Sequence, residues 1–210
     1  MGRMDVYYWW PYVEASTVNG GNITMAEKEI EYTIQVDNNI STDDQEIRIA
    51  FYSNIGFFIE VAQMLEYNLR KLLCYHKSVT EIEEGDLTKE RVETICKKYD
   101  DYYSKTYEEK YTLGKLTNQL NCIKQLDKKV LKIFTEINDY RILVVHKLFQ
   151  INVVVDKLRD SKNVLEYTNE RLIPMTNKTK SVNDMVINII NAYKEDLHTY
   201  KDQVGIEYEK

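Results

Sequence analysis

Two pairs of arginine and histidine in this chain lie close enough in sequence to be candidates for acid–base chemistry. Arg141 precedes His146 by five residues, and Arg70 precedes His76 by six. An imidazole can accept or donate a proton near neutral pH, and a guanidinium can compensate the charge that grows on phosphate oxygens. Spacing alone cannot choose between the pairs. The elements that carry them and the residues around them must decide.

Arg141 interrupts the apolar seam of a predicted helix. The apolar residues of this seam recur at steps of three and four: Val130, Phe134, Ile137, Val144 and Leu148. A guanidinium buried there without a partner costs several kcal/mol, so we expect an anionic group to meet Arg141. Five steps along an ideal helix turn a side chain by about 140°. Arg141 and His146 therefore share one face only if the helix distorts or a second chain contributes. The alternative is a structural arginine at a helix junction beside a satisfied histidine.

The same apolar rhythm predicts four main helices. The first begins at the N-cap residues 41–44 and runs to about Lys77, and a break at Gly85 and Asp86 precedes the second. The later segments are a short helical piece at 113–123, a long helix from about 127 to 157, and a last helix from 163 with an interruption at Pro174. We expect residues 46–210 to form an all-α, four-helix-type up-down bundle domain.

Residues 1–45 have a different pattern of apolar and polar residues from the predicted bundle. Ile30, Ile34 and Val36 belong to an alternating apolar and polar run, and Asn19-Gly20-Gly21-Asn22 has the composition of a turn. This pattern predicts a small N-terminal β-hairpin extension. The alternative is a partly disordered segment.

Composition and charge narrow the classes of function. Apolar residues make up 43% and charged residues 30% of the chain, with seven Gly and two Pro. Long helices suit these values, whereas a dinucleotide-binding fingerprint or a many-stranded sandwich needs more glycine. The net charge is −6, yet residues 111–180 hold 13 basic and seven acidic side chains. This cationic segment is either a solvated helix face or a surface that contacts phosphate.

The cysteines and the apolar stretches indicate mainly which features the protein lacks. Cys74, Cys96 and Cys122 are odd in number and form no C-x-x-C pair, so we expect reduced, buried thiols and neither a metal ion nor another cofactor. The best candidate for an apolar membrane-spanning stretch, 49–59, has 11 residues, which are too few to span a membrane. We therefore expect a cytoplasmic protein with no membrane partner.

Four tyrosines share one predicted helix face at a spacing of four: Tyr99, Tyr103, Tyr107 and Tyr111. Acidic residues surround them, which favours packing against a neighbouring helix over a base-stacking platform.

Flanking residues distinguish the two arginine–histidine pairs, because three stretches resemble the HEPN family of helical-bundle domains. They are IGFFIEVAQMLE at 55–66, TLGKL at 112–116 and DYRILVVHKLF at 139–149. The third stretch is similar to the family's R-x4–6-H motif. The resemblance spans about residues 46–175 and implies that Arg141 and His146 are the catalytic residues, with the Arg70 and His76 pair as a decoy.

The resemblance also implies an activity and partners. It implies a metal-independent endoribonuclease of HEPN type that cleaves single-stranded RNA in a cleft shared by a homodimer, without DNA specificity. The setting would be defence or toxin–antitoxin systems, with an antitoxin or another defence protein as partner. Ile142 stands where active members usually have a polar residue, and Leu148 stands where a modified tyrosine would be needed. The alternative is a catalytically degenerate HEPN-like protein that binds a protein partner.

Overall fold

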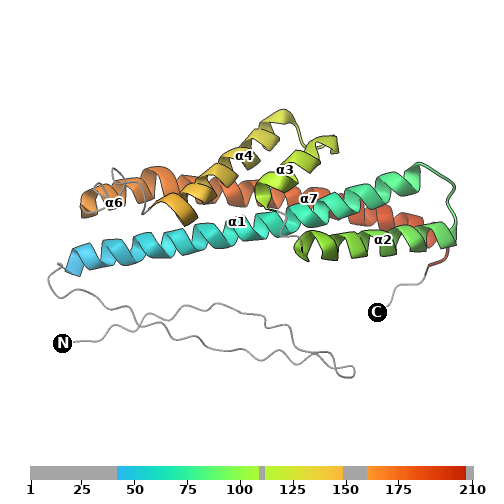
Figure 1. The fold of residues 1–210 in the computed structure, drawn as a ribbon, viewed down its shortest axis with the longest axis horizontal. Coiled ribbons are helices and arrows are strands. Elements are labelled where there is room, and N and C mark those ends of the chain that lie inside the picture. Colours follow the sequence, from blue (N-terminus) through green and yellow to red (C-terminus); the bar gives the residue numbers. More distant parts are fainter. Residues whose placement is uncertain (1–41, 109–111, 149–159, 207–210) are drawn as a thin grey trace, which may run out of the picture. The chain divides into compact units, whose positions relative to one another are not determined.

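The computed structural model describes residues 42–108, 112–148 and 160–206. These residues form helices and short turns, with no strand among them, so the all-α expectation is confirmed. The expected hairpin lies outside the described residues. In chain order the helical elements are α1 (Thr42–Glu83), α2 (Lys89–Glu108), α3 (Leu113–Gln119), η1 (Leu120–Cys122), α4 (Lys128–Ile142), η2 (Leu143–Lys147), α6 (Ser161–Tyr167), η3 (Thr168–Leu172) and α7 (Ile173–Gln203) (Figure 1).

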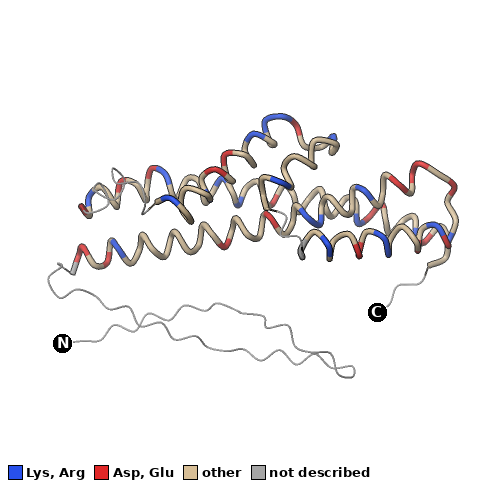
Figure 2. The backbone as a smooth tube through the Cα atoms, in the orientation of Figure 1, with Lys and Arg blue, Asp and Glu red and all other residues tan. Residues whose placement is uncertain are grey.

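Helix α1 is longer than the sequence pattern suggested. It continues past the predicted end near Lys77 because Val79 and Ile82 extend the apolar rhythm, and both side chains are buried. The chain then turns at Gly85 and Asp86, as expected. The part of α1 from residue 49 to 59 carries no charge, which Figure 2 shows as an unbroken tan stretch.

The long helices do not alternate in direction. Three hydrogen bonds join α1 to α7 at a nearly constant offset: Asn68 to Asn183, His76 to Tyr193, and Tyr200 to Glu83. The two helices are therefore parallel, whereas the first and last helices of an up-down bundle are antiparallel. The expected up-down order is wrong for this reason. After α2 the chain reverses direction through α3 and η1. It reverses again at α4, so α4 runs in the same direction as α2 (Figure 1).

Two apolar clusters form the core of the described helices, and α1 and α4 contribute to both. The larger cluster begins at Leu65 of α1 and includes Phe134 and Ile137 of α4 together with α2, α3 and α7. The smaller cluster includes Ala62 of α1, with these further buried residues: Phe51, Phe58, Val144, Leu148, Val164 and Leu172. The boundary between the clusters thus falls at Ala62–Leu65 on α1 and between Ile137 of α4 and Val144 of η2.

Two π-helices follow regular helices without a loop. Helix η2 continues α4, and η3 connects α6 to α7. The interruption expected at Pro174 is the restart of an α-helix at Ile173, because a proline in the first turn needs no amide donor. Helix η2 bears on the candidate site, because it begins just after Arg141 and includes His146.

Candidate functional site

Three charged side chains meet where α4 packs against α1. Glu66 and Arg70 come from α1, and Arg141 comes from the last turn of α4. Arg70 donates a hydrogen bond to Oε1 of Glu66, and Nη1 of Arg141 lies 3.2 Å from Oε2 of the same carboxylate. The expected anionic partner of Arg141 is therefore Glu66.

This charged cluster lies at the boundary of the two apolar clusters. Glu66 follows Leu65, the first residue of the larger cluster on α1. Arg141 falls between Ile137 of α4 and Val144 of η2. An uncompensated charge at such a position would be costly, so the three side chains compensate one another. The boundary thus places a polar group inside the bundle while leaving both cores apolar.

The three side chains differ in their access to solvent. Arg70 and Glu66 keep 9% and 12% of their side-chain surface exposed, whereas Arg141 keeps 26%. One carboxylate and two guanidinium groups also leave a net charge of +1 in the cluster. A ligand from solvent can therefore reach the positive charge through Arg141.

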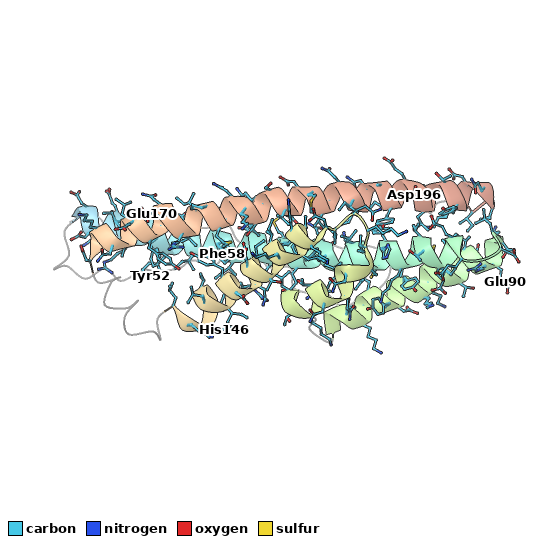
Figure 3. The ribbon with its side chains drawn as sticks, turned by 90° about the horizontal axis from the view of Figure 1, so that it is seen from above. Tyr52, Phe58, Glu90, His146, Glu170 and Asp196 are labelled. Atoms are coloured by element: carbon cyan, nitrogen blue, oxygen red, sulfur yellow. The ribbon has the colours of Figure 1, made fainter. Side chains whose placement is uncertain are left out.

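His146 lies on the π-helix η2, five residues after Arg141, and its side chain is exposed (Figure 3). A π-helix closes its hydrogen bonds between residues five apart, so its turn is wider than that of an α-helix. The distortion that the spacing requires is thus present between the two residues. Within the described ranges no hydrogen bond or ion pair joins Arg141 to His146.

Two apolar side chains are exposed beside this pair. Ile142 and Val145 keep 36% and 45% of their surface in solvent. Exposed apolar residues are ordinary one by one, but these two lie on the same short segment as Arg141 and His146. The segment therefore presents an imidazole and apolar side chains together.

The second arginine–histidine pair has a different role. Arg70 is held by Glu66, while Nδ1 of His76 lies 2.9 Å from the hydroxyl of Tyr193 on α7. Tyr193 in turn donates a hydrogen bond of 3.0 Å to Oε1 of Gln125. Burial lowers the pKa of His76 from its ordinary value of 6.5. In this arrangement His76 connects α1 to α7.

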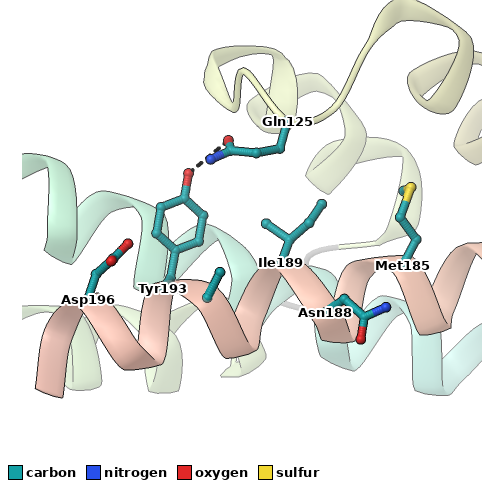
Figure 4. A pocket seen from close by; sticks show the side chains of 7 residues that line it. Gln125, Met185, Asn188, Ile189, Tyr193 and Asp196 are labelled. Carbon is teal, nitrogen blue, oxygen red and sulfur yellow. Dashed lines mark hydrogen bonds between the residues drawn. The ribbon is translucent and has the colours of Figure 1, made fainter.

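A shallow hollow of about 280 Å³ adjoins Tyr193 (Figure 4). Its lining is mainly apolar and comes from the turn after η1 and from α7: Gln125, Met185, Asn188, Ile189, Ala192, Tyr193 and Asp196. Asp196 is its one ionisable carboxylate, and no arginine or histidine lines it. The hollow offers little to an anionic ligand.

The tyrosines of α2 pack against α1, as the acidic surroundings suggested. The hydroxyl of Tyr99 donates a hydrogen bond of 2.6 Å to Glu81, and the ring of Tyr103 meets that of Tyr67 edge to face. Burial raises the pKa of Tyr103 to about 12. The side chain of Tyr107 and the whole of Tyr111 lie outside the described residues.

The thiols and carboxylates show no further candidate site in the described part of the chain. The three cysteines are free thiols; Cys74 is buried, which raises its pKa to about 12, but Cys122 is exposed, contrary to expectation. No three histidine, cysteine or acidic side chains among the described residues gather closely enough to hold a metal ion. None of the described helices combines the length and the apolar character that a membrane span needs.

Comparison with protein-family models, with curated proteins and with solved structures finds no match to this chain. The resemblance to the HEPN family is carried by the three sequence stretches alone.

Glu66 is the member of the candidate site that the sequence pattern did not single out. It ends the stretch 55–66 and precedes Arg70 by one helical turn, a spacing that already suggests an ion pair. Its contact with Arg141 joins residues 75 positions apart, so local spacing could not reveal it.

Proposed function

We propose that this chain is a metal-independent endoribonuclease of HEPN type that acts on single-stranded RNA as a homodimer. The observation that supports it most is the placement of Arg141. Glu66 holds its guanidinium at the surface of the bundle, and the π-helix that follows presents the exposed His146.

The proposed reaction uses these two side chains in different roles. His146 accepts the proton of a ribose 2′-hydroxyl, whose oxygen attacks the adjacent phosphorus. Arg141 compensates the negative charge that grows on the non-bridging oxygens. The bond from phosphorus to the 5′-oxygen breaks, the 5′-oxygen takes up a proton, and the products are a 2′,3′-cyclic phosphate and a 5′-hydroxyl. No group is oxidised or reduced.

A homodimer suits the surface beside His146. Ile142 and Val145 lose their exposure if a second copy covers them, and burial of apolar area stabilises association. The second copy would also bring its own Arg141 and His146 to the cleft. Lys147 and several lysines of α4 are exposed and can contact the RNA backbone: Lys128, Lys129 and Lys132.

The test is cleavage of a long single-stranded RNA by the purified chain in the presence of EDTA. We expect cleavage that is lost in Arg141→Ala and in His146→Ala and retained in His76→Ala, which is the matched control for loss of an imidazole. Formation of 2′,3′-cyclic phosphate ends identifies the chemistry. An activity lost in His76→Ala alone would assign the reaction to the other pair.

A second candidate function keeps the fold and omits the chemistry. Ile142 cannot orient a phosphate, and with Val145 it forms an exposed apolar pair that fits a protein partner, such as an antitoxin or another defence protein. The variant Ile142→Asn distinguishes the two functions, because we expect it to increase cleavage by an active cleft. Intact RNA with both the wild type and Ile142→Asn would favour the binding protein.

A further inference from the structure

Glu66 binds its two arginines unequally. Arg70 lies on the same helix, is almost buried and donates a hydrogen bond to Oε1. Arg141 comes from another helix, is the most exposed of the three and approaches Oε2 to 3.2 Å. That approach lacks hydrogen-bond alignment, since Oε2 accepts no hydrogen bond among the described residues. The contact of Arg141 is therefore the weaker of the two.

Two guanidinium groups contact the one buried carboxylate of the cluster. A buried carboxylate needs a cationic partner, because an uncompensated one is strongly unfavourable. If Arg141 leaves, Arg70 still compensates Glu66. If Arg70 were absent, Arg141 would have to stay at the carboxylate.

We infer that Arg141 exchanges between Glu66 and a phosphate of bound RNA, and that Arg70 is the positioning residue that permits this exchange. The choice of RNA as the anion rests on the proposed function. Guanidinium binds a phosphate through charge-assisted hydrogen bonds, which the misaligned contact with Glu66 does not supply. Arg70 acts on the ligand only through Glu66, because its own side chain is nearly buried.

Charge counting gives the order of affinities that this inference requires. The wild-type cluster has a net charge of +1, Arg70→Met has zero, and the double variant Arg70→Met with Glu66→Gln returns to +1. The single variant Glu66→Gln has +2 and leaves Arg141 without a competing carboxylate. We expect the affinity for RNA to fall in Arg70→Met, to recover in the double variant and to rise above wild type in Glu66→Gln.

The experiment uses a fluorescently labelled, fully 2′-O-methylated single-stranded oligoribonucleotide, which cannot be cleaved by 2′-hydroxyl attack. Fluorescence anisotropy gives the dissociation constant at several salt concentrations. We expect Arg70→Met to bind about tenfold more weakly than wild type, the loss of one charge-assisted contact. The slope of log K against log salt should fall by about 0.7 in magnitude, the value for one phosphate contact on a single strand. Arg70→Lys, which keeps the charge, should bind nearly as wild type.

A purely structural ion-pair cluster gives the opposite order. It predicts that Glu66→Gln binds no better than wild type and that the double variant binds no better than Arg70→Met, and either result overturns the inference. If Arg70→Met does not fold, as thermal unfolding would show, Glu66→Gln alone decides. Absence of any binding to the oligonucleotide also overturns it. The cleavage assay is independent of this binding experiment. If the variants show the expected order of RNA affinities but the wild type does not cleave RNA, only the proposed reaction is disproved.

Discussion

Two polar sites interrupt the buried face of α1, and they differ in charge and in access to solvent. At Glu66 a carboxylate binds two arginines, and one of them reaches the surface. At His76 an imidazole, a phenol and an amide form a chain of hydrogen bonds between α1, α7 and the turn after η1. Both sites contain a member of an arginine–histidine pair. The first combines two guanidinium groups with a single carboxylate.

The difference shows that two arginine–histidine pairs of similar spacing can lie in different surroundings. Arg70 and His76 each make a hydrogen bond to a side chain inside the bundle, with Glu66 and Tyr193 respectively. Arg141 and His146 are both more exposed, and the π-helix η2 begins after Arg141 and carries His146. The two pairs therefore differ in burial: Arg70 and His76 lie inside the bundle, whereas Arg141 and His146 lie nearer to solvent.

The largest effect on folding should come from removing the carboxylate that both arginines share. We expect Glu66→Ala to lower the free energy of unfolding by about 3–5 kcal/mol, because two guanidinium groups lose their counter-charge beside an apolar core. Urea unfolding followed by circular dichroism measures the change. Glu60→Ala on the exposed side of the same helix is the matched control, with an expected change within about 0.5 kcal/mol. Equal losses in the two variants would show that the cluster has no special role in stability.

The two arginines should contribute unequally, in line with their exposure. We expect Arg141→Met to lower the free energy of unfolding by about 1 kcal/mol or less, since Glu66 keeps Arg70 and the lost pair is partly in solvent. Arg70→Met should cost at least about twice as much, because it removes the aligned hydrogen bond of a buried carboxylate. Urea unfolding of both variants under the same conditions measures the ratio. An Arg141 variant that is the less stable of the two would contradict the unequal binding.

Local patterns in the sequence predicted what depends on neighbours along the chain. The recurrence of apolar residues at steps of three and four predicted the helices and the buried seam of α4. The cost of burying an unpaired guanidinium predicted an anionic partner for Arg141. The extension of α1 to Glu83 was readable from Val79 and Ile82 but was missed.

Features that depend on tertiary contacts were beyond the sequence. The identity of Glu66 as the partner and the parallel course of α1 and α7 each depend on contacts between distant segments. The sequence pattern also did not predict the π-helix at Leu143–Lys147. The exposure of Ile142 likewise follows from what α4 packs against and not from its type.

A smaller effect is expected at the second site, where no charge is involved. Tyr193→Phe removes the hydroxyl that links His76 to Gln125 and keeps the ring. We expect the free energy of unfolding to fall by about 1 kcal/mol, the usual net value of a neutral hydrogen bond. Gln125→Ala should show part of the same loss, and the double variant should lose less than the sum because the residues share one network. Strict additivity in this cycle would contradict a linked network.

The smallest expected effect is a pH dependence of stability that comes from His76. Burial lowers the pKa of this imidazole in the folded state below its ordinary value of 6.5, so the unfolded state takes up the proton first as the pH falls. The stabilising contribution is therefore complete above about pH 6.5 and decreases as the pH falls below that value. Urea unfolding of wild type and His76→Gln at about pH 7.5 and about pH 5 tests this, since the variant should lose less stability over that range. His198→Gln, a change at an exposed histidine on α7, is the control and should keep the wild-type dependence. An unchanged pH dependence in His76→Gln would mean that the proton is not excluded from the folded site and that the network at Tyr193 tolerates a charged imidazole.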